Sequence, residues 1–480
     1  MNFGLDVFRF SDRLAALTCF VLFVVPLVAY CAWRVPLGQV PDEPAHIARV
    51  GSVLRGEIIG YRLKSSNPLT GAPDAGVTGN YGLALASIAG NGETAPLPAS
   101  ASAKARLTWV KAIPWSPTPM FISSVNTAAY APVAYIPAAV ALGIAIEAGV
   151  RPHNAAIAAR FGNVVAFAAL GCLALLLAGR GRLLMLVTLG LPTTIWLAGS
   201  CNQDGTLIAA AVLAIALLTR CDRTSFWIGT VLLAVLALQK PPFAALMLLP
   251  LIAPAAAAVT WTTRVAAALL VIMPAMLWSI LVIQHVTVPL LPSAPYHPGP
   301  LWPGDPHRIF RSAIAQAQLQ VILRHPFRLT LQPLINKIPG FPTIWTQMIG
   351  TLGPFTIEVP ESVRLPFILA LLSSAAALLS GAQPSGQRRW TFLLALLALS
   401  TCAELIYMVE YLTWTPVGCS IIEGVQGRYF LPLLPVLTLI LGRLIPLSER
   451  FGWIWWITPV FALILLNFQL PSIIAQHYYR

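Results

Sequence analysis

Long runs of apolar residues recur along the whole chain, and many approach the length of about 20 residues that an α-helix needs to cross a bilayer. Hydrophobic residues make up 57% of the 480 residues and charged residues only 10%, and the mean hydropathy is +0.76. The sequence therefore predicts an all-α polytopic membrane protein, a bundle of about 11–13 transmembrane helices forming a single integral membrane domain over residues 1–480. The apolar segments span residues 14–33, 127–148, 156–178, 183–197, 207–218, 226–238, 243–259, 265–283, 365–379, 390–408, 430–441 and 453–468.

The formal net charge of +13 has a simple explanation in a membrane protein, because cytoplasmic loops collect Lys and Arg. A nucleic-acid partner would require a soluble basic domain, and the sequence shows none. The seven cysteines are scattered and form no CxxC pair, so neither a disulfide framework nor a cysteine metal site is expected. Cys201 with Cys419 is the one disulfide pairing left open, and His297 and His307 are interpreted as loop histidines rather than metal ligands.

The distribution of arginines predicts an orientation. Basic residues in the turns near 180–182, 220–223, 264, 388–389 and 443–450 fit the cytoplasmic side, which places residues 202–204, 285–364 and 410–428 outside. Arg9 and Arg13 place the N-terminus inside, so the first long loop, residues 34–123, is expected outside as well. Counting crossings from the N-terminus does not agree with this scheme, because it would put Asp204 inside. One segment between 127 and 197 must therefore be broken or fail to span, and residues 127–148, which contain Pro132 and Pro137, are our candidate.

Two adjacent carboxylates and a histidine, in the run Pro41-Asp42-Glu43-Pro44-Ala45-His46, follow the first apolar segment. Pro44 suits the first position of a helix, which places Glu43 at the N-cap and Asp42 just outside it. The helix is expected to run to about Leu54, to stop at Gly56, and to lie as an amphipathic helix on the membrane surface. Its polar face would carry His46, Arg49 and Ser52. The alternative is a capped, solvated helix start with no further role.

Two further polar positions interrupt apolar segments. Asp204 ends the run Ser200-Cys201-Asn202-Gln203-Asp204, and a carboxylate at the membrane edge is costly unless it is paired or used. Its alternative role is to cap a helix that begins near Thr206. Lys240 stands at a helix junction before Pro241 and Pro242, where it could bind a lipid phosphate or extend toward the interface.

The run from Glu423 to Pro432, EGVQGRYFLP, is the second strong motif. Gly424 and Gly427 permit close backbone approach. Arg428 has the planar fork that suits phosphate, and Tyr429 suits the membrane interface. The alternative is an Arg-Tyr anchor at the start of a span.

Together these groups suggest one site on the outer face. Carboxylates there could act as a general base or hold a divalent cation, and Arg and Lys could hold a phosphate. A membrane enzyme that uses a sugar carried on a polyprenyl phosphate needs both, because charge develops on the departing lipid phosphate.

The motifs around Asp42, Asp204, Lys240 and Arg428 together resemble the bacterial membrane-protein family Domain of Unknown Function 2142 over nearly the whole chain. That family in turn is similar to the GT-C superfamily of integral membrane glycosyltransferases, which includes the lipid A aminoarabinose transferases and the protein mannosyltransferases. The Asp-Glu motif of those enzymes, in the first extracytoplasmic loop, matches Asp42-Glu43. The resemblance implies a GT-C-like bundle whose long first outer loop carries amphipathic juxtamembrane helices.

The resemblance also implies roles for individual residues. Asp42 would be the base or a metal-linked carboxylate with support from Glu43, and Asp204 would match the second acidic position. Asp42 and Asp204 would hold Mg or Mn if the enzyme depends on metal, although Asn202-Gln203-Asp204 departs from the two-carboxylate motif of the superfamily. By our own inference Arg428 and Lys240 contact the donor phosphate. The supporting residues are His46, Asp204, Gln426 and Tyr429.

The expected function is transfer of a sugar from a polyprenyl-phosphate-linked donor to a cell-envelope glycan or lipid acceptor. The protein would lie in the bacterial cytoplasmic (inner) membrane among membrane lipids, with its site facing the periplasm or cell exterior, and the acceptor would bind within the membrane or the two long loops. The alternatives are a transporter or flippase for lipid-linked glycans and a non-catalytic scaffold.

Overall fold

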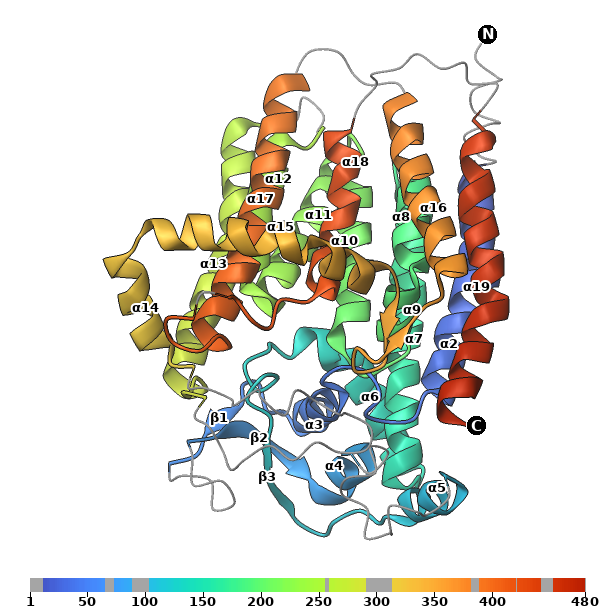
Figure 1. Cartoon of the computed structure of the whole chain (residues 1–480), viewed down its shortest axis with the longest axis vertical. Helices are drawn as coiled ribbons and strands as arrows, with labels where there is room; N and C mark the ends of the chain where they lie inside the picture. The colour runs from blue at the N-terminus through green and yellow to red at the C-terminus, as the bar shows by residue number, and fades with distance from the viewer. Residues whose placement is uncertain are drawn as a thin grey trace.

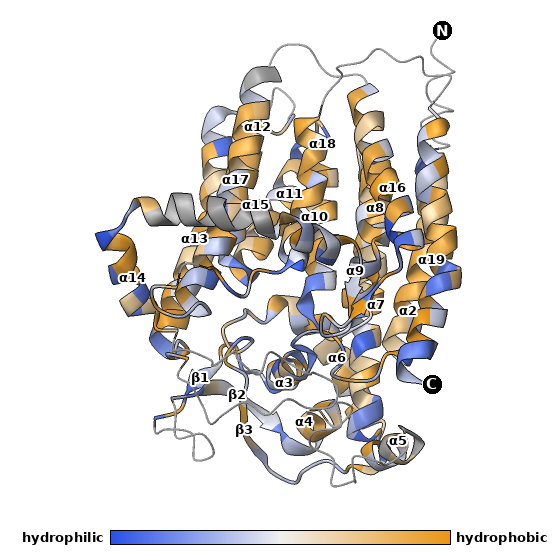
Figure 2. Cartoon of the chain, in the orientation of Figure 1, coloured by the Kyte–Doolittle hydropathy of each residue, from blue (hydrophilic) through white to orange (hydrophobic). Residues whose placement is uncertain are grey.

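The structure, a computed structural model, describes residues 12–64, 73–88, 103–254, 259–290, 313–380, 388–419, 421–441 and 452–479. Long helices run side by side in a bundle, and short helices with a small sheet form a layer across its lower end (Figure 1). Figure 2 shows that the bundle helices are mostly apolar and that polar residues gather in and near the lower layer. The all-α polytopic class is confirmed.

Six of the described helices are long and apolar enough to cross a membrane, or up to seven if a bent pair counts as one span. The expected number of about 11–13 exceeds this count, because several apolar segments form helices shorter than the roughly 20 residues that a bilayer requires. The six long helices are Asp12–Arg34, α7 (Pro152–Leu177), α13 (Trp261–His285), α16 (Glu361–Ser380), Trp390–Thr413, which belongs to α17 (Arg388–Thr413), and Ile454–Tyr478, which is α19. The first of them contains the π-helical turn η1 (Phe20–Val24) and α2 (Val25–Arg34).

Shorter apolar helices fill the bundle between the long ones. Residues 127–148, the segment expected not to span, form only the turn η3 (Val133–Tyr135) and the 12-residue helix α6 (Ile136–Glu147), in agreement with that prediction. The others are α8 (Arg182–Gly190), α9 (Pro192–Ala198), α10 (Gln203–Leu218), α11 (Arg223–Gln239), η4 (Pro241–Leu248), α12 (Leu249–Ile252), η5 (Gly427–Val436) and α18 (Leu437–Ile440).

Helices α9 and α10 form a sharp reversal, bent by 117°. Asn202 caps α10, since its side-chain oxygen accepts a hydrogen bond from the backbone N–H of Asp204 at 2.8 Å. Gly205 allows the two helices to approach, because a Cβ at this position would lie 2.4 Å from the Cα of Ala198. This reversal holds Asp204 at the N-terminal end of α10.

Replacing Gly205 by alanine is expected to destabilise the protein by about 1–3 kcal/mol, because the added methyl group would meet backbone atoms that cannot move aside. Gly340→Ala is the matched control: it is also a helical glycine, but its Cβ would have no neighbour within 4 Å, and alanine favours the helix. Thermal unfolding in detergent compares the two. Equal unfolding temperatures for both variants would contradict the close approach at Gly205.

The basic turns lie together at the end of the bundle opposite the reversal. The C-terminal ends of α7 and α10 meet there, with the Gly179 N–H bonded to Thr219 Oγ1 at 2.9 Å and Arg220 donating to the Leu177 carbonyl at 3.3 Å. At the other end, the Asn202 amide donates to the Pro41 carbonyl at 3.1 Å. The basic turns and Asp204 therefore lie at opposite ends of the bundle, as the distribution of arginines predicted. Which end faces the cell interior stays a prediction. Residues 443 and 450 lie outside the described residues.

The first long loop contains a small β-sheet in addition to helices, whereas only amphipathic helices were expected there. Strands β1 (Tyr61–Arg62), β2 (Ala75–Asn80) and β3 (Pro119–Ser123) make an antiparallel sheet in the order β1-β2-β3, with Val77 paired to Ile122. The loop also holds α3 (Glu43–Leu54), α4 (Tyr81–Ile88) and α5 (Ala103–Ala112).

Helix α3 does end near Gly56 as expected, but its expected polar face is not exposed, and its place on the membrane surface stays a prediction. His46, Arg49 and Ser52, the expected polar face, are all buried in the protein. Arg49 donates to the Ser52 hydroxyl at 3.0 Å and to the Tyr130 carbonyl at 2.9 Å. The polar face of α3 is therefore satisfied by neighbouring protein groups rather than by water.

The second long stretch contains α14 (Ala315–Arg324) and α15 (Phe327–Gly350), and α15 runs across the bundle in Figure 1 rather than along it. A short hairpin of β4 (Thr351–Leu352) and β5 (Ile357–Glu358) follows. The loop histidines His297 and His307 lie outside the described residues. All seven cysteines are free, so the pairing of Cys201 with Cys419 is not formed.

Candidate functional site

Asp42, Asp204, Lys240 and Arg428 meet in one group, which we call the ion cluster. Arg428 lies 2.5 Å from Asp42 (Nη2 to Oδ2) and 3.5 Å from Asp204 (Nε to Oδ2), and Lys240 Nζ lies 2.6 Å from Asp204 Oδ1. The two carboxylates and two cations come from four regions of the chain, and Arg428 also donates to the Pro41 carbonyl at 3.3 Å. The predicted convergence of the N-terminal acidic motif with the C-terminal arginine is confirmed.

Asp42 takes the N-cap position of α3, and Glu43 is already helical, so the sequence-based cap assignment was wrong by one residue. Asp42 adopts a left-handed backbone conformation with φ of 61°, which is uncommon outside glycine but tolerated by Asp and Asn. Its side chain makes no capping bond and points to Arg428, and the amide of Asn126 donates to it at 3.0 Å. The backbone conformation thus turns a carboxylate that could have capped α3 toward the cluster.

Asp204 lies in the first turn of α10, where Asn202 is the N-cap. The alternative that Asp204 only caps the helix is therefore wrong, because its carboxylate is bound by Lys240 and Arg428 instead. A negative charge in the first turn also faces the positive end of the α10 dipole.

The two cations are enclosed by protein. The side chains of Lys240 and Arg428 are only 12% and 5% exposed, which contradicts a lysine extending to the interface and an arginine acting as a surface anchor. Both cations lie over the ring of Tyr429, at 4.6 Å for Lys240 Nζ and 5.4 Å for Arg428 Cζ. Tyr429 therefore supports both cations from one side.

The two glycines of the C-terminal motif are both needed for packing. Gly424 has φ of 86°, and a Cβ on Gly427 would lie 2.4 Å from the Ile344 carbonyl oxygen of α15. Gly427 also donates its N–H to Gln347 at 2.8 Å. Gln426 is the N-cap residue of η5, and its side-chain oxygen is buried without a hydrogen-bond partner in the described part of the chain. This close packing on α15 fixes where Arg428 enters the cluster.

His46 lies near the ion cluster, packed against the aromatic rings of Tyr130 and Tyr135. Its Nδ1 is 2.7 Å from the Tyr135 hydroxyl, and its ring stacks on Tyr130. Burial lowers the pKa of His46 to about 4, against the attraction of the carboxylates of Asp42 and Asp204. The imidazole is therefore neutral at neutral pH and supports the site by packing.

Glu43 does not join the ion cluster. It is fully buried and paired with Arg160 of α7, whose Nε and Nη2 lie 2.6 and 2.5 Å from its two oxygens. The backbone N–H groups of Gly38 and Cys201 donate to the same carboxylate at 3.0 and 3.1 Å. Glu43 thus connects the loop after α2, the start of α3 and the α9–α10 reversal, and this network holds Asp42 and Asp204 near each other.

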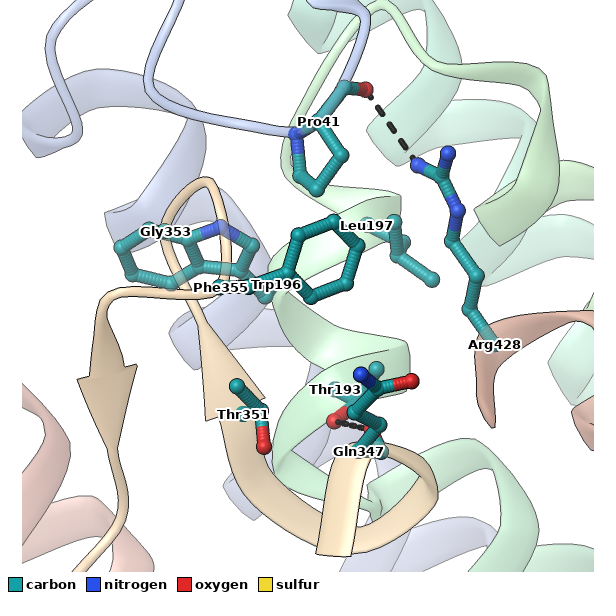
Figure 3. Close-up of a pocket in the computed structure, with 9 residues that line it drawn as sticks. All are labelled: Pro41, Thr193, Trp196, Leu197, Gln347, Thr351, Gly353, Phe355 and Arg428. Carbon is teal, nitrogen blue, oxygen red and sulfur yellow. Dashed lines mark hydrogen bonds between the residues drawn. The ribbon is translucent and has the colours of Figure 1, made fainter. Parts of the chain in front are cut away.

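Two hollows adjoin the ion cluster. One of about 10 Å³, the size of a single water, lies beside Arg428. Figure 3 shows that the rings of Trp196 and Phe355 are among the groups that line it and that the Arg428 guanidinium is directed at the Pro41 carbonyl. The larger cavity, of about 90 Å³, lies between η4 and α17. Its lining combines apolar groups with the hydrogen-bonding and charged groups Lys240, Glu410, Tyr130 and Tyr429, and the full set is Tyr130, Lys240, Pro241, Pro242, Phe243, Ile406, Val409, Glu410 and Tyr429.

The predicted metal ligands Asp42 and Asp204 are bridged by a guanidinium, the cation of Arg428. Among the described residues, no group of three or more His, Cys, Asp or Glu side chains is arranged to hold a metal ion. As arranged, these two carboxylates do not fit a divalent cation, because Arg428 already occupies the space between them. A metal requirement stays a prediction.

Sequence reasoning did not identify three residues that the structure places at or near the site. Arg160 interrupts an apolar segment, and an arginine at such a position is a detectable signal because it must find a partner. Glu410, at the end of the apolar run 390–408, carries a similar signal. The sequence around Asn126 contains no such signal, because an asparagine in a polar loop is common.

A comparison with protein families matches residues 22–437 to the model described as a predicted membrane protein, DUF2142. A search of the curated proteins finds no match, and a search of the solved structures finds none. Because the matched region covers most of the chain and includes all four residues of the ion cluster, the chain belongs to the DUF2142 family of membrane proteins.

Proposed function

We propose that the protein is a membrane glycosyltransferase that moves a sugar from a polyprenyl-phosphate-linked donor to a cell-envelope glycan or lipid acceptor. The observation that carries the proposal is the ion cluster itself: two enclosed cations, Lys240 and Arg428, held beside a cavity in an apolar helix bundle. Enclosed charges are expensive unless they are paired, and sites that keep them are frequently functional.

The cations match the chemistry of the donor. When the bond between the sugar and a lipid phosphate breaks, negative charge grows on the phosphate oxygens, and fixed positive groups lower the barrier by stabilising that charge. Arg428 offers a planar fork suited to phosphate, and Lys240 offers a point charge that lines the cavity. Asp42 and Asp204 fix the directions of both cations before the donor arrives.

A transporter or flippase for lipid-linked glycans would use the same cations. Transport requires charged or polar groups along a path between the two faces, whereas the four residues of the ion cluster lie together near the end of the bundle that carries the α9–α10 reversal. This arrangement favours chemistry at one face. In our proposal that face is the periplasmic or exterior face of the bacterial inner membrane.

The test is an assay of the purified protein in liposomes with radiolabelled short-chain polyprenyl-phosphate hexoses and a panel of octyl glycosides as acceptors. We expect free polyprenyl phosphate and a labelled octyl glycoside to appear together. Movement of intact donor across the bilayer without either product would overturn the proposal in favour of transport. A silent Asp42→Asn variant in cells, with the glycan unchanged, would favour the scaffold.

A further inference from the structure

Among the carboxylates at the site, Glu410 is the one without an ionic partner. It lies near the end of α17 and lines the 90 Å³ cavity together with Lys240. In the part of the chain that the structure describes, its carboxylate makes neither an ion pair nor a hydrogen bond. Its backbone carbonyl, in contrast, accepts from Trp414 and Thr415 at 3.0 and 2.9 Å. A partly buried, unpaired carboxylate that faces a cavity calls for an explanation beyond folding.

The C-terminal motif leaves room for the Glu410 side chain. A Cβ on Gly424 would lie 2.4 Å from Glu410 Oε2 and 2.6 Å from Trp414 Cδ1, so the absence of a side chain at Gly424 makes room for the carboxylate. The same motif delivers Arg428 to the ion cluster. One segment therefore positions the cation and leaves space for the carboxylate.

The other two carboxylates are poorly suited to accept a proton. Asp204 is bound by both cations, and Asp42 is bound by Arg428 and Asn126. Partial burial raises the pKa of Asp42, but the Arg428 guanidinium more than offsets this and holds that pKa below its usual range. A general base works best with a pKa near the operating pH, so an ion-paired aspartate is a weak one.

We propose that the cavity between η4 and α17 receives the acceptor hydroxyl and that Glu410 is the catalytic residue that takes its proton. This inference rests on the proposed function and names the base within it. The acceptor O–H bond breaks and its proton passes to a Glu410 oxygen, while the acceptor oxygen forms a bond to the anomeric carbon of the sugar. The bond from that carbon to the phosphate oxygen breaks, and its electron pair leaves with the polyprenyl phosphate beside Lys240 and Arg428.

The decisive variant is Glu410→Gln, which keeps the shape of the side chain and removes its basicity. Using the octyl glycoside assay, we expect transfer to fall about 10²- to 10⁴-fold. Azide attacks carbon without losing a proton, so added azide is expected to restore release of polyprenyl phosphate, with glycosyl azide as the new product. The Asp42→Asn variant loses a carboxylate of the ion cluster rather than the proposed base. Azide is therefore not expected to restore its turnover.

Controls separate this inference from the proposed function and from folding. Glu404→Gln removes a carboxylate of the same helix that does not line the cavity, and it is expected to leave transfer unchanged. Glu410→Asp keeps a carboxylate but withdraws it by one methylene, and it is expected to retain more activity than Glu410→Gln.

Wild-type protein that never releases polyprenyl phosphate would refute the proposed function. Active wild-type protein with a fully active Glu410→Gln variant would overturn only the role of Glu410. A loss that azide does not reverse, in a variant with an unchanged unfolding temperature, would overturn that role as well.

Discussion

Replacing Asp42 by asparagine is expected to abolish sugar transfer, with a loss of about 10³-fold or more, while the protein stays folded. The substitution removes the charge that fixes Arg428 at 2.5 Å, so the guanidinium loses its direction toward the donor phosphate. Folding is retained for two reasons. Asparagine tolerates the left-handed φ of 61° at this position, and the buried Arg428 guanidinium keeps the Asp204 carboxylate at 3.5 Å as a counter-charge. Turnover in liposomes and thermal unfolding in detergent measure the two effects.

Asp222→Asn is the matched control for Asp42→Asn. Asp222 also precedes a helix and pairs with an arginine, Arg220 at 2.8 Å, but it lies at the opposite end of the bundle, where the basic turns gather. Its replacement is expected to leave transfer unchanged. Full activity of Asp42→Asn would refute the role assigned to Asp42, and an unfolded variant would show that the residue is needed for structure instead.

The apolar runs predicted the helices of the bundle well, because segments that are buried in lipid or protein consist mostly of apolar residues. They did not predict α15, which combines apolar residues with polar ones and three prolines, or the β1–β2–β3 sheet, whose strands are short and separated by long connections. Its central strand contains Gly76, where a Cβ would lie 2.0 Å from the Ile122 carbonyl oxygen. A close approach of this kind depends on a neighbour more than forty positions away, which a local pattern does not contain.

The membership of the ion cluster followed from sequence. Asp204, Lys240 and Arg428 each border an apolar segment, where a charged side chain is costly unless it is paired or used, and Asp42 belongs to the pair of adjacent carboxylates in the loop after the first segment. Which carboxylate pairs with which cation could not be predicted from the sequence. Asp42 and Glu43 are neighbours with the same charge, yet a left-handed residue at the helix start sends one to Arg428 and the other to Arg160. That division depends on a single backbone angle and on where α7 passes, and neither is visible in the motif.

The second large effect concerns stability. Glu43→Gln is expected to destabilise the protein by about 3–5 kcal/mol, because it leaves the guanidinium of Arg160 buried without a counter-charge. Both side chains are fully buried, and Arg160 also donates to the carbonyls of Ala32 and Pro36 at 3.2 and 3.1 Å. These carbonyl bonds do not neutralise the charge. Chemical unfolding in detergent gives the change in free energy.

A double-mutant cycle then tests whether the cost comes from the unpaired charge. Arg160→Met alone leaves the Glu43 carboxylate unpaired, whereas combining Arg160→Met with Glu43→Gln removes both charges, so the double variant is expected to be more stable than the sum of the single losses predicts. Glu361→Gln is the control, since the Glu361 carboxylate that pairs with Arg364 is itself largely exposed and its loss is expected to change stability by less than about 0.5 kcal/mol. Because the Glu43 network holds the α3 start against the α9–α10 reversal, single variants that still fold should also lose transfer. Additive losses in the cycle would show that Glu43 and Arg160 act independently, and the ion cluster would then need another support.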